Sequence, residues 1–166
     1  MTKVRTLLAT AVLVVLSALF GAGVIATSAS AEPSESDNHL TGTWNVTVNR
    51  PAPLPPLKSV QVFMSSGAMI EMANEPQATR TAQYGAWEPI RGRLYAASGL
   101  FYRFDPQGKF AGTTKINRTI QLGPDGNTIR YISRVSIYDA SNHLVSSVVA
   151  KADGVRMPVE RTSDVP

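Results

Sequence analysis

Two long runs of alternating apolar and polar residues, joined by a short turn, constrain the fold of this chain most strongly. Apolar residues fall mainly on even positions from Phe110 to Leu122 and on odd positions from Ile129 to Ile137. Side chains alternate across a strand with a period of two, so the loop must bring even positions opposite odd ones. A four-residue loop from Pro124 to Asn127 does this, whereas a three-residue loop does not. The pattern predicts a long antiparallel hairpin with Leu122 opposite Ile129.

A second hairpin is predicted around the turn Ser65-Ser66-Gly67. Apolar residues alternate on both sides of this turn, at Val60, Val62 and Met64 and again at Ala68, Ile70 and Met72. A three-residue loop that ends in glycine is a common hairpin connection. We therefore expect Val62 opposite Ile70, with Glu71 on the other parity and pointing outward.

Other alternating segments complete a series of strands, and no helical periodicity of useful length occurs after residue 40. Trp44, Val46 and Val48 mark a first strand. Further strands are predicted at 80–87, 93–104 and 144–151, with a short last one near 155–159.

About eight strands, nearly all joined by hairpin-length turns, predict an all-β up-and-down meander. Closure into a barrel removes exposed strand edges. A barrel of about eight strands is either filled by side chains or holds one small ligand. We expect a single antiparallel β-barrel, with a β-sandwich as the alternative.

The N-terminus has the order of a secretory signal peptide. Lys3 and Arg5 precede an apolar run from Leu7 to Ile25, and small residues end at Ala29-Ser30-Ala31. This order predicts a signal peptide over 1–31 with cleavage after Ala31, a disordered polar tether over 32–39 and a barrel domain over 40–166. The alternative is an uncleaved anchor, because about 20 apolar residues can span a bilayer.

Composition favours an exported bacterial protein that binds no nucleic acid. The chain contains no cysteine, although small secreted eukaryotic domains usually rely on disulfides. The net charge is +4, and it falls to +2 once Lys3 and Arg5 are removed. The remaining basic residues are dispersed, and no nucleic-acid motif is present. After cleavage we expect no membrane span, and the oligomeric state stays open.

Gly42-Thr43-Trp44 resembles the G-x-W signature that opens the first strand of lipocalins and their relatives in the calycin superfamily. The resemblance implies that Trp44 closes one end of the barrel and packs against an arginine from near the chain end, Arg156 or Arg161. Asn45 stands where the family commonly has an aromatic residue. Barrels of the allene oxide cyclase and dirigent type, and small barrel cyclases, have a similar size and strand count and stay open as alternatives.

No residue is assigned a catalytic or metal-binding role, and no cofactor is expected. His39 borders the tether and His143 lies in a predicted turn. Zinc sites usually need several cysteines or histidines together. No serine lies in a G-x-S-x-G motif.

Arg118 breaks the apolar pattern of its strand. It shares a face with Ile116, Ile120 and Leu122, and a buried arginine needs a partner or an anionic ligand. One interpretation is that Arg118 reaches the rim or pairs with an acid elsewhere in the chain. The other is that it anchors a carboxylate or enolate in an apolar cavity. Candidate residues of the cavity wall are Tyr102, Phe104 and Tyr131.

Three functions follow from these features. We expect a secreted lipocalin-like protein that binds or carries a small apolar molecule, with or without an anionic group. The first alternative is a barrel enzyme of the cyclase or isomerase type, which leaves enzymatic activity open. The second is a secreted surface interaction module without a small ligand.

Overall fold

The computed structural model describes residues 39–76 and 78–161, and these form a β-barrel domain. The predicted signal peptide and all but the last residue of the predicted tether lie outside the described residues. No helix in the described part is long and apolar enough to cross a membrane. The strands are β1 (Gly42–Asn49), β2 (Leu57–Phe63), β3 (Ala68–Ala73), β4 (Gln83–Arg91), β5 (Leu94–Phe104), β6 (Phe110–Leu122), β7 (Thr128–Tyr138) and β8 (Leu144–Arg156).

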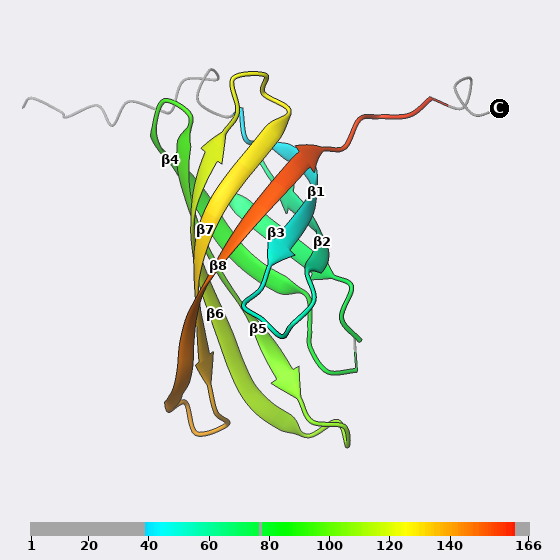
Figure 1. The fold of residues 1–166 in the computed structure, drawn as a ribbon, viewed down its shortest axis with the longest axis vertical. Helices are drawn as coiled ribbons and strands as arrows, with labels where there is room; N and C mark the ends of the chain where they lie inside the picture. The colour runs from blue at the N-terminus through cyan, green and yellow to red at the C-terminus, as the bar shows by residue number, and fades with distance from the viewer. Residues whose placement is uncertain (1–38, 77, 162–166) are drawn as a thin grey trace, which may run out of the picture. The chain divides into compact units, whose positions relative to one another are not determined.

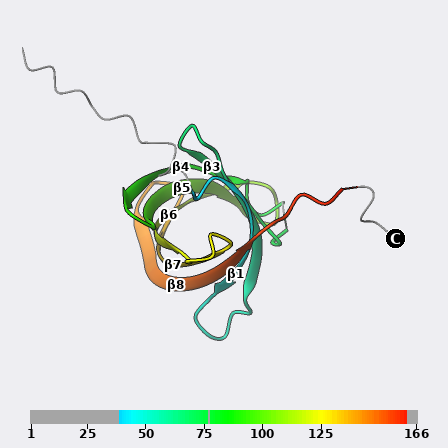
Figure 2. The same cartoon turned by 90° about the horizontal axis from the view of Figure 1, so that it is seen from above.

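Each strand pairs with the next along the chain, and β8 pairs with β1 to close the barrel (Figures 1 and 2). All the pairs are antiparallel, and the closing pair runs from Trp44 opposite Arg156 to Asn49 opposite Lys151. The expected up-and-down barrel is therefore confirmed. The sandwich alternative is wrong, because the strands form one continuous closed sheet.

The register of the long hairpin is confirmed. Leu122 lies opposite Ile129, and Arg118 lies opposite Ser133. The side chains of Ile120, Leu122 and Ile129 are buried inside the barrel, as the alternation requires.

The register of the β2–β3 hairpin is also confirmed, with Val62 opposite Ile70. The predicted facing of Glu71 is wrong, because Glu71 points into the barrel and is buried. The apolar residues of the predicted alternation, Val60, Val62, Ile70 and Met72, lie on the outer surface, while Phe63 and Met69 point inward. One apolar row crosses four strands there, formed by Val62, Ile70, Tyr84 and Leu100.

Part of the inner face of these strands is polar, where it contacts a buried arginine. Ser59 and Gln61 on β2 and Gln83 on β4 point inward together with Glu71. Alternation alone marks two faces without saying which is inside. Here the usual assignment of the apolar face to the interior fails, since the polar face holds the partners of Arg118.

Two strands differ in extent from the predictions. β4 begins at Gln83 and runs through Pro89 to Arg91, with a register irregularity between the last two. Arg80 forms only an isolated bridge to Arg103. β8 continues without a break to Arg156, so no separate last strand follows.

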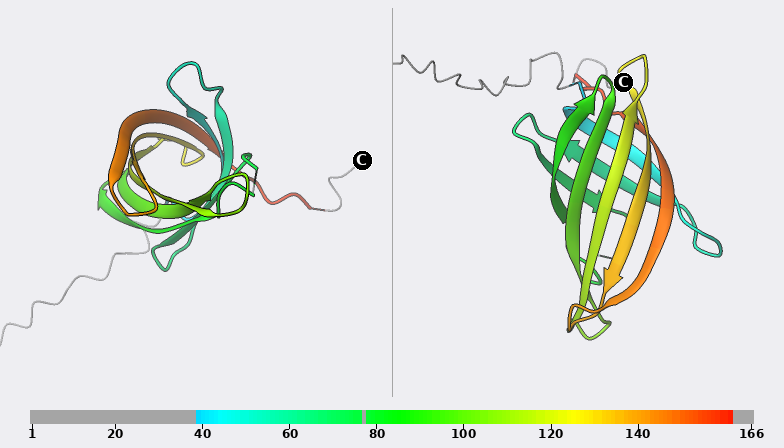
Figure 3. Two further views of the ribbon diagram at one scale, coloured as in Figure 1. Left: turned by 90° about the horizontal axis from the view of Figure 1, so that it is seen from below. Right: turned by 90° about the vertical axis from the view of Figure 1, so that its left-hand side faces the viewer.

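Unequal strand lengths leave one end of the barrel open. β1 to β4 have 6 to 9 residues, whereas β5 to β8 have 11 to 13. The longer strands extend beyond the shorter ones at the end where the β5–β6 and β7–β8 turns lie (Figures 1 and 3). We call this the open end.

Aromatic side chains fill the opposite, closed end. The rings of Phe63 and Trp87 meet edge to face at 6.0 Å, and those of Trp87 and Tyr95 at 5.8 Å. The buried Trp44 donates its indole N–H to the Leu40 carbonyl at 2.9 Å. Edge-to-face pairs add to the large apolar area that such rings bury, so this end is a well-packed core.

Arg156 covers Trp44 at the closed end. Its guanidinium carbon lies 4.3 Å from the centre of the indole ring. The same group donates to the carbonyls of Thr41 at 2.6 Å and Gly126 at 2.9 and 3.0 Å. Gly42 has a φ of 135°, and a Cβ there would lie 2.5 Å from Arg156 Nη1. Arg156 therefore contacts both Gly42 and Trp44, the glycine and tryptophan singled out in the sequence.

Candidate ligand-binding site

A layer of polar side chains crosses the barrel below the aromatic closed end. Arg118, on the middle of β6, is only 4% exposed. Its Nη2 forms an ion pair with Glu71 and donates to Gln83 Oε1 at 2.9 Å. Its Nη1 contacts the Met69 sulfur at 3.6 Å. The acid that could not be placed from the sequence is thus Glu71, and Arg118 is neutralised by it.

Tyr131 completes this polar layer from β7. Its hydroxyl accepts a hydrogen bond from Gln61 Nε2 at 2.7 Å, and Arg118 lies 5.6 Å from its ring. Burial raises the pKa of Tyr131 from 10.0 to about 12, while the nearby charge of Arg118 opposes the rise. The hydroxyl is therefore neutral at physiological pH. Arg118, Glu71 and Tyr131 form the floor of the cavity described next.

A cavity of about 440 Å³ lies between the polar floor and the open end. This volume is in the range of small-molecule sites. Much of its wall is apolar, and the apolar residues that line it are Val48, Leu54, Leu57, Phe101, Phe104, Ile116, Val135, Ile137, Val148 and Ala150. The barrel is thus filled at one end and hollow at the other.

Charged side chains gather at the mouth of the cavity. Glu75 bridges two arginines, with Oε1 2.8 Å from Arg50 Nη1 and Oε2 3.1 Å from Arg80 Nη1. Arg50 also holds the proline-rich β1–β2 loop, since its Nε donates to the Pro55 carbonyl at 2.8 Å. This loop covers the mouth only in part, because just Arg50, Pro51 and Leu54 of it line the cavity.

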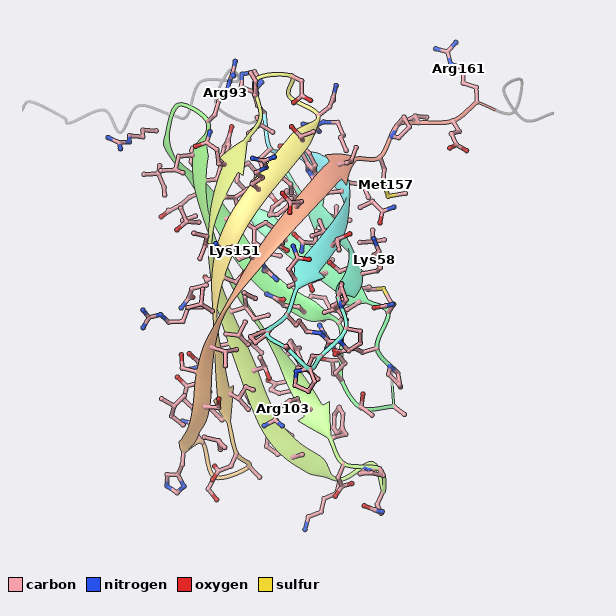
Figure 4. All side chains as sticks on the ribbon, in the orientation of Figure 1. Lys58, Arg93, Arg103, Lys151, Met157 and Arg161 are labelled. Carbon is pink, nitrogen blue, oxygen red and sulfur yellow. The ribbon has the colours of Figure 1, made fainter. Side chains whose placement is uncertain are left out.

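Arg103 is the third arginine of the mouth. It lies in the half of the barrel away from Arg93 and Met157 (Figure 4). Its Nη2 donates to the Tyr138 carbonyl at 2.6 Å and to the Ala111 carbonyl at 3.4 Å. Within the described residues it forms no ion pair with an acid. Its cross-strand neighbour is Arg80, so two like charges face each other.

Some donors at the mouth are buried without a partner. Arg80 is 7% exposed, and its guanidinium stacks on Phe101 at 3.7 Å. Neither Arg80 Nη2 nor Arg103 Nε has a hydrogen-bond partner among the described residues. Such groups are costly unless something binds them.

The cavity carries a net positive charge that is concentrated at the mouth. Four arginines line it, namely Arg50, Arg80, Arg103 and Arg118, together with two glutamates, Glu71 and Glu75. The floor pair is neutral, so the excess of two positive charges belongs to the mouth.

Three of the four predicted ligand-binding residues line the cavity: Arg118 and Tyr131 at the floor and Phe104 at the mouth. Tyr102 instead points outward and is 49% exposed, with its ring against Phe110 at 5.9 Å. The inward residues of β5 include Tyr95, Ala97 and Phe101. β5 has large apolar residues on both parities, so its own pattern does not identify the inner face. Phe104 reaches the cavity next to a register shift between Arg103 and Phe104.

Sequence reasoning missed Phe101, Glu75 and the arginines of the mouth. Pairing β5 with β6 would have found Phe101, because it lies opposite Thr114 on the known inner face of β6. Glu75 has no comparable signal in the sequence, because it lies between β3 and β4 and contacts the separate β1–β2 loop.

The histidines lie away from this site. His143 is exposed, with Nδ1 3.4 Å from Asp139 Oδ2, and the His39 carbonyl accepts from Arg156 at the closed end. Within residues 39–76 and 78–161, no three side chains of the metal-binding types gather closely enough to hold an ion.

Comparison with known proteins gives no relative to guide the interpretation. No family model matches the chain, and neither the curated proteins nor the solved structures include a significant match. The geometry of the barrel is therefore the basis on which a function is inferred.

Proposed function

We propose that this barrel binds a small, mainly apolar molecule in its open half. One observation carries the proposal: a cavity of about 440 Å³ with largely apolar walls lies between a polar floor and a mouth of arginines. Binding sites of this kind combine apolar walls with a few placed polar groups that orient the ligand. The excess positive charge at the mouth favours a ligand that carries an anionic group.

We also propose that the protein is exported and acts as a lipocalin-like carrier. The order of Lys3, Arg5, the apolar run and Ala31 supports export. The stacking of Arg156 on Trp44 beside Gly42 supports a barrel built on the lipocalin plan.

Binding is favoured over the two alternatives by two observations. Clustering of Arg118, Tyr102 and Tyr131 in a closed cavity would favour an isomerase or cyclase, yet Tyr102 lies on the outer surface. A filled barrel would favour a surface module, whereas this one is hollow in its open half.

Native mass spectrometry of the protein purified from the culture medium of its own host tests both parts of the proposal. Export predicts a mature chain that begins at Glu32. Carriage predicts an additional bound mass, which would identify the ligand class. A chain that retains residues 1–31 would contradict cleavage, and a persistently empty protein after incubation with host lipid extract would contradict carriage.

Two matched variants locate the bound mass. Ala150→Phe places a ring in the cavity, because Ala150 lines it and is buried. Val149→Phe places the same ring on the outer surface, where Val149 is exposed. We expect the first variant to lose the bound mass and the second to keep it, with both showing the circular dichroism spectrum of the barrel.

A further inference from the structure

We infer that the ligand is a single-chain amphiphile with a carboxylate at one end, and that this carboxylate binds at the mouth, between Arg80 and Arg103. The inference rests on the proposed function, and it adds the class and the orientation of the ligand.

The floor is a poor site for an anion. Arg118 keeps Nε unpartnered, but its Nη atoms already donate to Glu71 and Gln83 and contact Met69, and Glu71 cancels its charge. A carboxylate placed there would face Glu71, a like charge at close range in a buried setting. Repulsion between two such carboxylates is strongly unfavourable unless one is protonated.

The mouth has the opposite balance. Two of its three arginines, Arg50 and Arg80, share Glu75 as their acidic partner, and Arg103 has none among the described residues. Among the described residues, Arg103 donates its hydrogen bonds to backbone carbonyls. Arg80 is more than nine-tenths buried, lines the cavity and keeps Nη2 unpartnered. A carboxylate between Arg80 and Arg103 would relieve the repulsion of these neighbours and accept from donors that now lack partners.

The carboxylate of Glu75 binds the mouth arginines as the ligand carboxylate would, and the two can exchange. Its two oxygens bind different arginines, Arg50 through Oε1 and Arg80 through Oε2. Glu75 can therefore release Arg80 to an incoming carboxylate and stay bound to Arg50. The partial exposure of its side chain, 31%, places this exchange at the solvent boundary.

The apolar cavity walls indicate the chemical character of the rest of the ligand. With the carboxylate at the mouth, an aliphatic or aromatic body lies along Phe101, Ile116 and Val135. Its far end reaches the Tyr131 side of the floor, which is polar but carries no net charge. A neutral amphiphile would gain only the burial of its chain.

Isothermal titration calorimetry of the mature protein with octanoate and with octan-1-ol at pH 7.5 tests the inference. The two probes share a chain and differ in the charged end. We expect octanoate to bind about tenfold more tightly than the alcohol, the size of one charge-assisted interaction. Equal affinities would overturn the inference and leave the proposed function intact, whereas binding of neither probe would contradict both.

Variants assign the preference to the mouth. Arg103→Gln should reduce octanoate affinity about tenfold and leave octanol unchanged. Glu75→Gln removes the competing carboxylate and should raise octanoate affinity several-fold. Arg134→Gln makes the same charge change on the exposed outer face of β7 and should change neither.

A floor variant tests the alternative that the carboxylate binds at the floor of the cavity. Replacing both partners, by Glu71→Met with Arg118→Met, removes the floor charges without leaving one unpaired. The octanoate preference should survive in this protein. Its loss there, with retention in Arg103→Gln, would move the anion site to the floor and overturn the inference.

Discussion

The two ends of this barrel use the same strands for different purposes. At the closed end, Trp44, Trp87 and Tyr95 fill the interior, and Arg156 covers it. At the open end, the same sheet surrounds a cavity whose mouth holds three arginines and one glutamate. The closed end therefore has the composition of a core, and the open end that of a binding site.

Under the proposed function, stability and ligand binding are divided along the barrel axis. The aromatic core supplies apolar burial that does not depend on the cavity. The open half can then keep unfilled volume and unpaired donors, which would be costly in a protein with no other core. The polar layer around Arg118 lies between the two regions.

The largest expected effect comes from removing the core of the closed end. Trp44→Ala deletes a fully buried side chain and leaves Arg156 without its stacking partner. We expect a loss of about 5 kcal/mol in the free energy of unfolding, at the upper end for such truncations. Urea denaturation measures it. A loss below about 1 kcal/mol would show that this end is not the main core.

The polar layer around Arg118 should give the next largest effect on the free energy of unfolding. Glu71→Gln leaves Arg118 buried without a countercharge, and we expect a loss of about 3 kcal/mol. The double replacement Glu71→Met with Arg118→Met should recover most of that loss, because no unpaired charge remains. Urea denaturation of the single and double variants tests this. Equal stabilities of the two variants would contradict a buried ion pair.

The raised pKa of Tyr131 predicts a pH dependence of stability that is specific to this polar layer. Its folded pKa of about 12 lies above its ordinary value of 10.0, so the folded state favours the neutral hydroxyl. This contribution is complete below pH 10 and is lost as the pH rises through 12, up to about 2 to 3 kcal/mol. Unfolding free energies at pH 8 and pH 11.5 should diverge less in Tyr131→Phe than in the parent. Tyr84→Phe, on the exposed outer row, serves as the control and should behave like the parent.

The smallest effect should come from the outer face of β3. Met72 is 50% exposed on β3, and Met69 on the same strand is 1% exposed on the inner face. We expect Met72→Ala to change stability by no more than about 0.5 kcal/mol and Met69→Ala to cost at least about 2 kcal/mol. Thermal and urea unfolding of this pair compare the two faces directly. Similar losses would show that the outer face is covered by something outside the described barrel.

The sequence predicted the closed barrel and the register of two hairpins because each depends on local information. A turn and two alternating runs determine which residues face each other, as for Leu122 and Ile129. The choice of the inner face is not local. For β2 and β3 it depends on Arg118, which is distant in sequence and needs Glu71 inside.

The candidate site was predictable to a similar degree. Arg118 was identified because it interrupts an apolar face, and its position at the cavity floor follows from the register of β6. The mouth was not identified, because it depends on where β1 to β4 end relative to β5 to β8. That relation arises only when the barrel closes, and it brings Arg50, Arg80 and Arg103 around Glu75.

The most direct test of the central claim is a set of intermolecular nuclear Overhauser effects between octanoate and the methyl-labelled mature protein. Binding in the open half predicts contacts from the ligand chain to the methyl groups of Ile116, Val135 and Ala150, which line the cavity. The outer-row methyl groups of Val62, Ile70 and Leu100 should show none. Contacts confined to the outer row, or no contacts at saturating ligand, would contradict the assignment of the cavity as the binding site.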